Sequence, residues 1–215
     1  MNLRQQAREM SREAIIDAAG PQFAAYGYEA TSFARVAEAM GKPRSAIGYH
    51  IFPSKLMLAT SVIERQQAVW RQLEDGLEVV PGIERLVTLL LTSTMQARRS
   101  PFAAGAIRLL HELPQAGLEV PREYVWADVV REQFRVAALL KDPGEPEVGD
   151  DAVSLMLSAT FGLLTASSDV DEARFEQRLK SLWTPLLHSF GFADAESAVE
   201  RTEPASLVGA SRLQG

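Results

Sequence analysis

Three neighbouring side chains, those of Lys42, Arg44 and Ser45, offer the clearest chemistry in the sequence, which is hydrogen-bond donation to a polyanion. Arginine can donate two parallel hydrogen bonds to guanine, and lysine and serine can donate to phosphate oxygens. The sequence has no cysteine, no Gly-rich phosphate loop, no HExxH and no Gly-x-Ser-x-Gly. His111 and Glu112 have no second metal ligand at helical spacing. We therefore expect a nucleic-acid-binding protein and not an enzyme, with no metal and no organic cofactor.

The stretch around these donors predicts two short helices separated by a tight turn. Apolar residues recur at i, i+3, i+4 and i+7 over residues 33–40, which indicates one buried helix face. Ser32 precedes this helix as a cap, and Gly41 follows it where a left-handed residue is needed. Pro43 suits the first turn of a second helix, expected over residues 43–50. This order is the helix-turn-helix pattern, whose second helix enters the major groove of DNA.

The charge of the chain is divided unevenly. The net charge is −6, but the first 60 residues carry seven basic and five acidic side chains, while the remainder carries 15 basic and 23 acidic ones. This asymmetry is typical of a nucleic-acid-facing head on an acidic body. The lack of cysteine excludes disulfides and favours the reducing cytoplasm. No apolar run reaches the roughly 20 residues needed to span a bilayer, and the polar N-terminus is unlike a secretory signal, so we expect no membrane partner.

Only helical periods appear in the rest of the chain, which predicts an all-α protein with two parts. A three-helix, helix-turn-helix DNA-binding domain is expected over residues 1–54, with an arm at residues 1–10. A helical domain for ligand binding and dimerisation is expected over residues 55–191. A flexible tail over residues 192–215 completes the chain, with one short helix near residues 195–201. The other expected helices cover residues 11–26, 55–78, 82–99, 102–112, 121–141, 150–167 and 171–190.

A series of residues in the first part resembles the N-terminal signature of the TetR family of bacterial transcriptional repressors. The spacing from Gly41 to Phe52 is one residue longer than in the family, and the extra residue falls within residues 42–48. The resemblance implies a transcriptional repressor that binds double-stranded operator DNA sequence-specifically. The matching positions run in order along the chain: Ile15-Ile16-Asp17-Ala18-Ala19, Phe23, Gly27-Tyr28, Thr31-Ser32, Val36-Ala37, Gly41, Tyr49-His50 and Phe52-Pro53-Ser54-Lys55.

The donors and the resemblance together give a set of candidate DNA contacts. Arg44 begins the second expected helix and is the best candidate for a base edge. Tyr49 and His50 resemble family positions that meet the DNA backbone or bases, and Lys55 resembles a phosphate contact. For His50 the alternative is a polar packing residue, and for the hydroxyl groups it is helix capping alone. The candidates are Thr31, Ser32, Lys42, Arg44, Ser45, Ala46, Tyr49, His50 and Lys55.

A single helix-turn-helix reads few bases, so such proteins usually dimerise and read two half-sites about 34–36 Å apart in a palindromic operator. In the family the last two long helices of the body pair with those of a second copy. The alternative is that the same apolar residues fill the core of one copy. The candidates for the homodimer interface are Phe161, Leu164, Leu179, Trp183, Leu186 and Leu187.

Polar groups among large apolar ones in the helices expected over residues 82–141 favour a pocket for a small-molecule effector. Effector binding is expected to shift the helix at residues 55–78 and to change the separation of the two DNA-binding heads. Plain core packing is the alternative for Trp126 and Phe134, and a satisfied core or surface histidine is the alternative for His111. The candidates are Gln96, Arg108, His111, Tyr124, Trp126, Gln133 and Phe134.

The sequence thus predicts a ligand-responsive, homodimeric repressor in the cytoplasm. If the extra residue within 42–48 distorts the second helix, the alternative is a dimeric small-molecule-binding helical protein with weak or no specific DNA binding. An architectural DNA protein is a third class, but it would need strong overall basicity, which this acidic chain lacks.

Overall fold

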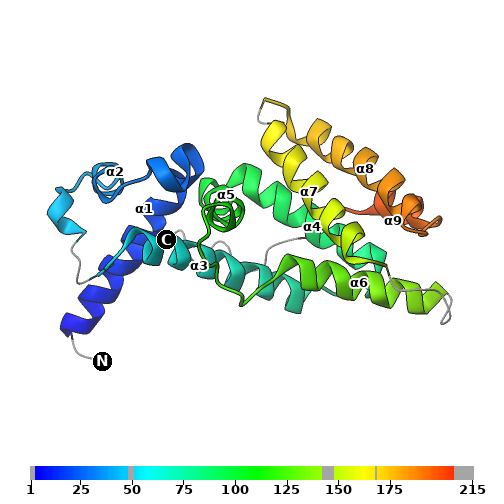
Figure 1. Cartoon of the computed structure of the whole chain (residues 1–215), viewed down its shortest axis with the longest axis horizontal. Helices are drawn as coiled ribbons and strands as arrows, with labels where there is room; N and C mark the ends of the chain where they lie inside the picture. The colour runs from blue at the N-terminus through cyan, green and yellow to red at the C-terminus, as the bar shows by residue number, and fades with distance from the viewer. Residues whose placement is uncertain (1–2, 48–50, 142–147, 168, 206–215) are drawn as a thin grey trace. The chain divides into compact units, whose positions relative to one another are not determined.

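The structure is a computed structural model that describes residues 3–47, 51–141, 148–167 and 169–205. Every regular element in these ranges is helical, and Figure 1 labels the α-helices in chain order. The predicted all-α fold is thereby confirmed. The elements are α1 (Leu3–Ala30), α2 (Phe33–Ala39), the 3-10 turn η1 (Arg44–Ala46), α3 (Lys55–Gly76), α4 (Ile83–Arg99), α5 (Pro101–Gln115), α6 (Trp126–Lys141), α7 (Asp150–Ala166), α8 (Glu172–Ser189) and α9 (Ala195–Arg201).

The chain forms two compact units, which are described separately. Unit 1 consists of residues 1–69 and 99–124, and unit 2 consists of residues 70–98 and 125–215. α5 therefore belongs to the unit that contains α1 and α2, although it follows α4 of unit 2 along the chain. The predicted boundaries after residues 54 and 191 concern function rather than packing, and they stay a prediction.

The core of unit 1 joins apolar faces of α1, α2, α3 and α5, and Phe23 and Phe52 are fully buried in it. α1 and α5 approach closely at Gly20 and Gly105, where the Phe102 ring of α5 also covers Gly20. A Cβ atom on Gly105 would lie 2.1 Å from the carbonyl oxygen of Gly20. Two helices from distant parts of the chain are thus in direct backbone contact.

α1 begins earlier than the predicted helix over residues 11–26, and its regular part ends where the prediction placed the end. Helical backbone already begins at Leu3, so the described part of the predicted arm is the first turns of α1. At Gly27 the helix breaks, with φ 73° and ψ −179°, and helical backbone then resumes to Ala30. This region of backbone space is open to glycine almost alone. The predicted end of the first straight helix before Gly27 is therefore confirmed.

α4 is the central helix of unit 2, because every residue from 86 to 95 is buried. Its hydroxyl groups are satisfied locally: Thr88, Thr92 and Thr94 donate to carbonyl groups one turn earlier. Hydroxyls that bond back to their own helix can be buried without losing a hydrogen bond. This part of the helix is therefore buried on all sides.

The segment after α8 packs against unit 2 as far as it is described. α9 coincides with the short helix predicted at residues 195–201. Phe192, Val199 and Thr202 are buried, and the Ala205 N–H donates to Thr92 Oγ1 at 2.9 Å. These residues differ from the predicted flexible tail because they pack against unit 2, with the Phe192 ring on Phe134 of α6 and Ala205 hydrogen-bonded to α4.

Candidate nucleic-acid interface

The ends of α2 are determined by the residues that flank it. Ser32 is the N-cap, and its side-chain oxygen accepts a hydrogen bond from the Arg35 N–H at 3.3 Å. After the last turn, Gly41 adopts φ 65°, which lets the Lys42 N–H donate to the Ala37 carbonyl group at 2.9 Å. Both predicted caps are confirmed. They fix the length of α2 and the direction in which the chain leaves it.

The turn after α2 presents polar and charged side chains to solvent. Lys42, Arg44 and Ser45 are all exposed. Ala37 before them and Ile47 after them are buried in the core of unit 1. The turn is thus held at both ends while its donors remain accessible. Two cations and a hydroxyl group on one short turn can bind phosphate oxygens or a guanine edge.

The second helix of the predicted helix-turn-helix is replaced in the described residues by a single turn. Arg44–Ala46 forms the 3-10 turn η1, and Ile47 closes it with φ −97° and ψ 78°. Pro43 before this turn and Gly48 after it leave a stretch too short and too poor in helix formers for several α-helical turns. Two predicted contacts, Tyr49 and His50, lie outside the described residues, and Ala46 is described by its backbone alone.

Thr31 and Lys55, also predicted as DNA contacts, bind the broken end of α1. Thr31 is only 2% exposed, and its Oγ1 donates to the carbonyl groups of Gly27 at 2.7 Å and Gln22 at 3.1 Å. Lys55 Nζ donates to the Tyr28 carbonyl group at 2.8 Å and lies 4.3 Å from the centre of the Tyr28 ring. Both residues therefore have an internal role in the structure. The low exposure of Thr31 does not favour a phosphate contact, whereas the phosphate contact of half-buried Lys55 stays a prediction.

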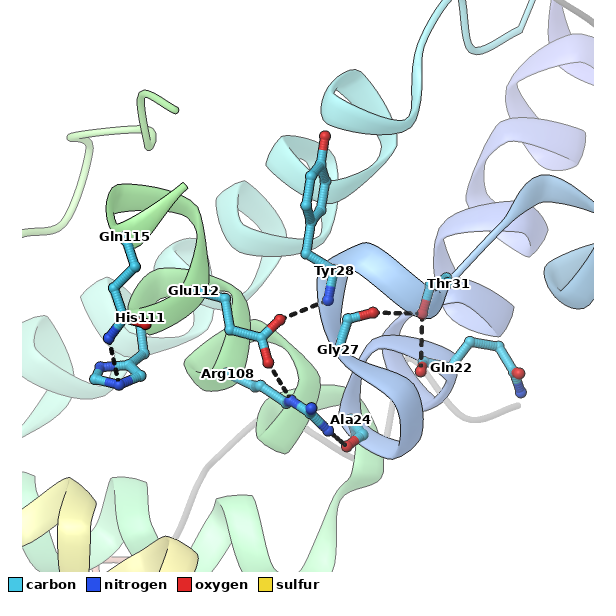
Figure 2. A network of polar contacts seen from close by, with 9 residues as sticks. All are labelled: Gln22, Ala24, Gly27, Tyr28, Thr31, Arg108, His111, Glu112 and Gln115. Atoms are coloured by element: carbon cyan, nitrogen blue, oxygen red, sulfur yellow. Dashed lines mark hydrogen bonds and ion pairs between the residues drawn. The ribbon is translucent and has the colours of Figure 1, made fainter. Parts of the chain in front are cut away.

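Two residues of α5 reach the same end of α1 (Figure 2). Arg108 Nε donates to Glu112 Oε1 at 2.6 Å, and Arg108 Nη1 donates to the Ala24 carbonyl group at 2.9 Å. Glu112 Oε2 accepts a hydrogen bond from the Tyr28 N–H at 2.5 Å. Burial raises the pKa of the Tyr28 hydroxyl above its ordinary value, and the Glu29 carboxylate adds to this shift, so the phenol stays neutral near neutral pH.

Sequence reasoning missed this part of the site. It assigned Arg108 to a ligand pocket and gave Glu112 no role. The one available signal was their spacing, because residues four apart on a helix form ion pairs.

Two further arginines of unit 1, Arg12 and Arg35, differ in whether their charge is available at the surface. Arg12, on α1, donates from Nη2 to Ser61 Oγ at 2.8 Å and lies 4.8 Å from the centre of the Phe52 ring. Arg35 is exposed on α2 and lies 4.1 Å from the centre of the Tyr26 ring. Arg12 is therefore an internal contact, whereas Arg35 adds positive charge to the surface of α2. The helical periodicity after the Ser32 cap could have indicated that Arg35 lies on the exposed face of α2.

The residues predicted to line a ligand pocket are divided between the two units. Arg108, His111 and Tyr124 belong to unit 1, and His111 is exposed and hydrogen-bonded to Gln115 at 2.8 Å. The remaining four residues, Gln96, Trp126, Gln133 and Phe134, belong to unit 2.

Within unit 2 three of these four residues have contacts that serve the core. Gln133 Oε1 accepts a hydrogen bond from the Gly82 N–H at 2.9 Å. The Phe134 ring stacks on Phe192 with ring centres 5.5 Å apart, and Trp126 meets Trp70 edge to face. The alternative of plain core packing thus describes what Trp126 and Phe134 do in this structure.

The predicted interface residues fall into two groups. Leu179, Trp183 and Leu187 of α8 are completely buried within the chain itself, and Trp183 Nε1 donates to Thr160 Oγ1 at 2.9 Å. These three residues belong to the core of unit 2 and are corrected from interface to core, because none of them is exposed on the surface of the chain. The partly exposed members are Phe161, Leu164 and Leu186.

Among the residues that the structure describes, no group of three His, Asp or Glu side chains is placed to hold a metal ion. A separate search of the described helices found none that is long and apolar enough to cross a membrane.

Comparison with known families gives one match in the region just described. Residues 15–62 match the family described as bacterial regulatory proteins, tetR family. The matched segment begins in α1, contains α2 and η1 with the exposed turn, and ends in α3. The search of curated proteins gives no match to the sequence.

Solved structures share the fold along most of the chain. A gamma-butyrolactone receptor described as an ArpA-like protein has 21% identity and a TM-score of 0.69, with 91% of this chain and 97% of that chain covered. CprB from Streptomyces coelicolor, in complex with its biological operator sequence, has 21% identity and a TM-score of 0.64, with 90% and 98% covered. RolR in complex with resorcinol has 16% identity and a TM-score of 0.60, with 94% and 98% covered.

Proposed function

Since the chain belongs to the tetR family of bacterial regulatory proteins, we propose that it is a homodimeric repressor that binds a palindromic operator and releases it when a small molecule binds. The observation that carries this proposal is the exposed turn of Lys42, Arg44 and Ser45, which directly follows the capped helix α2 inside the matched segment. We expect Arg44 to reach a base edge and Lys42, Ser45 and Ser32 to bind phosphate oxygens.

The small-molecule site is proposed in unit 2. Gln133, Trp126 and Phe134 are buried there, and Gln96 is half-buried on the central helix α4. Ser93 of α4 is also buried, and its Oγ has no hydrogen-bond partner in the structure. A buried hydroxyl without a partner favours a polar ligand that would satisfy it. RolR, solved with resorcinol, is an example of this fold with a bound small molecule.

The homodimer is proposed to form through the outer face of α7 and the partly exposed residues of α8. Leu155 is 49% exposed on α7, and Ser158, Gly162 and Ala166 are exposed on the same helix. Small residues beside an exposed leucine let two helices approach closely and bury apolar surface. This face replaces the buried α8 residues in the predicted interface and keeps Phe161, Leu164 and Leu186.

The experiment that tests the proposal begins by selecting duplexes from a random pool with the full-length protein. Affinity for the best duplex and for a scrambled one is then measured by fluorescence anisotropy at several salt concentrations. We expect preferential binding that weakens as salt rises. Arg44→Ala should reduce affinity for the selected duplex by about tenfold or more, because one two-bonded contact to guanine contributes about 1–3 kcal/mol.

Arg122→Ala is the matched control, since it removes an exposed positive charge elsewhere in unit 1. If Arg44→Ala and Arg122→Ala behave alike on the selected duplex, the proposed reading turn is wrong.

The second candidate function is a dimeric small-molecule-binding protein without specific DNA binding. The observation in its favour is that residues 44–46 form only a 3-10 turn. It predicts equal and weak binding to every duplex in the selection. A selected sequence that binds at least about a thousandfold more tightly than scrambled DNA, the lower end for specific regulators, would exclude it.

A further inference from the structure

The break in α1 separates two backbone groups that a regular helix would join. In an α-helix the N–H of residue 28 donates to the carbonyl group of residue 24. The backbone of Gly27, with φ 73° and ψ −179°, interrupts this hydrogen bond. Ala24 and Tyr28 therefore each need another partner, because unpaired buried backbone groups cost free energy.

Two side chains of α5 supply these partners as a connected bridge. The Ala24 carbonyl group accepts from Arg108 Nη1 at 2.9 Å, and Arg108 Nε donates to Glu112 Oε1 at 2.6 Å. Glu112 Oε2 then accepts from the Tyr28 N–H at 2.5 Å. Figure 2 shows the ion pair beside Gly27, with Arg108 reaching Ala24 before the break and Glu112 reaching Tyr28 after it. The ion pair thus occupies the place of the hydrogen bond that the break removes.

Gly27 provides the room for this bridge. A Cβ atom at Gly27 would lie 2.6 Å from Arg108 Nη2 and 2.6 Å from Glu112 Oε1. At these distances a Cβ atom would force the ends of both side chains to shift, which would disturb the bridge. The break and the close approach of α5 therefore depend on the same glycine.

The residues after the break lead directly to the exposed turn. Thr31 Oγ1 donates to the Gly27 carbonyl group at 2.7 Å, and Lys55 Nζ donates to the Tyr28 carbonyl group at 2.8 Å. Ser32, the next residue, caps α2. The angle at Gly27 thus sets where α2 begins, and α2 sets where Lys42 and the residues after it emerge.

We propose that Arg108 and Glu112 are positioning residues for the DNA-binding surface, through the break at Gly27, and are not ligand contacts. This inference rests on the proposed function. It also means that a movement of α5 can change the DNA-binding surface. α5 is joined to unit 2 at both ends, because the chain leaves unit 2 after residue 98 and returns to it at residue 125. Any rearrangement that moves α5 must either carry the two halves of α1 with it or break the bridge.

The test uses two substitutions at one position in the full-length protein. Glu112→Ala removes both the ion pair and the acceptor for Tyr28, whereas Glu112→Gln keeps an amide oxygen that can accept from the Tyr28 N–H. The matched control is Glu176→Ala in α8, whose carboxylate also pairs with a cation four residues away, Lys180, and is 27% exposed like that of Glu112. Each variant is measured with the selected duplex and with scrambled DNA.

We expect Glu112→Ala to lose about tenfold or more in affinity for the selected duplex, because the charged hydrogen bonds that hold the break at Gly27 are lost. Affinity for scrambled DNA should stay constant, since the exposed cations remain. Glu112→Gln should lie between the wild type and Glu112→Ala, and Glu176→Ala should match the wild type. Amide hydrogen exchange at Tyr28 should accelerate in Glu112→Ala and not in the control.

The outcomes separate the inference from the function on which it rests. If the wild type prefers a selected duplex and Glu112→Ala keeps that preference, the positioning role is overturned while the DNA-binding function stands. If exchange at Tyr28 is unchanged in Glu112→Ala, the bridge itself is overturned. If the wild type prefers no duplex, the DNA-binding function is overturned, and the positioning role with it. A melting temperature equal to that of Glu176→Ala, together with lost DNA preference, supports positioning over a general loss of stability.

Discussion

Gly105 lies against the backbone of Gly20 so closely that a Cβ atom on Gly105 would be 2.1 Å from the Gly20 carbonyl oxygen and 3.1 Å from the Ala24 nitrogen. The contact joins α5 to α1 just before the break at Gly27. Side-chain packing could not reproduce it, because there is no space for a side chain. The relationship makes the α1–α5 contact unusually sensitive to single methyl groups.

Gly105→Ala should therefore destabilise the protein by about 2–3 kcal/mol, the upper range for overpacked cores, because α1 and α5 must move apart. The measurement is equilibrium unfolding in urea. Gly76→Ala is the control, since Gly76 ends α3 and has no neighbour within 4 Å of an added Cβ. That control should change stability by less than about 1 kcal/mol, in the stabilising direction. Equal unfolding midpoints for the two variants would contradict the close contact.

Two other glycines with positive φ differ in both backbone strain and crowding. Gly41 has φ 65° with open space around it, so Gly41→Ala should cost only the left-handed backbone penalty of about 1–2 kcal/mol. Gly27→Ala adds the collision with Arg108 and Glu112 and should cost at least about 3 kcal/mol. Thermal unfolding followed by circular dichroism ranks the two. A Gly27→Ala protein as stable as Gly41→Ala would mean that the ion pair does not approach the break.

The buried hydrogen bond between α7 and α8 gives a third prediction. Thr160→Val keeps the shape of the side chain but removes the acceptor for Trp183 Nε1, leaving a buried N–H without a partner. We expect a loss of about 1–3 kcal/mol in unfolding free energy. Thr60→Val in α3 removes a hydroxyl that bonds only within its own helix and should change stability by less than about 0.5 kcal/mol. Calorimetry that finds no difference between these variants would remove Trp183 from the core.

The proposed dimer face gives a fourth prediction. Leu155→Asp places a charge on the exposed face of α7 and should raise the dimer dissociation constant by about tenfold or more, as at interface hot spots. Leu140→Asp is the control, because Leu140 is 71% exposed on α6, outside that face. Analytical ultracentrifugation over a range of protein concentrations gives both constants. A dimer that survives Leu155→Asp but dissociates with Leu140→Asp would move the interface to α6.

Local signals in the sequence were sufficient for most of the fold. Ser32 and Gly41 are caps whose side-chain and backbone chemistry acts within a few residues, so the bounds of α2 could be predicted. The end of the regular helix before Gly27 was predictable for the same reason, because glycine suits the residue that follows a helix. The candidate turn of Lys42, Arg44 and Ser45 follows from those caps, and its exposure agrees with the prediction.

Partners that are distant in sequence could not be predicted in this way. Arg108 is a polar residue on an apolar helix, which suits a ligand pocket and an ion pair equally until its partner, the carbonyl group of Ala24, is known. Thr31 is a hydroxyl near the turn, and only its 2% exposure shows that it faces inward. The helical spacing of Leu179 and Trp183 predicts that both lie on an apolar face. That spacing cannot distinguish burial within one chain from burial against a second copy.

The inclusion of α5 in unit 1 limits how the DNA-binding part can be produced alone. Ala106, Leu109 and Leu113 of α5 are buried in the same core as Phe23 and Val36. On the ribosome, α1 and α2 emerge well before these residues of α5 are synthesised. The core of unit 1 therefore cannot be completed until α5 has emerged. A fragment that ends after residue 54 would expose the apolar residues of α1 and α2 that α5 covers in the full chain. A minimal recombinant fragment therefore needs residues 99–124 joined back by an engineered linker.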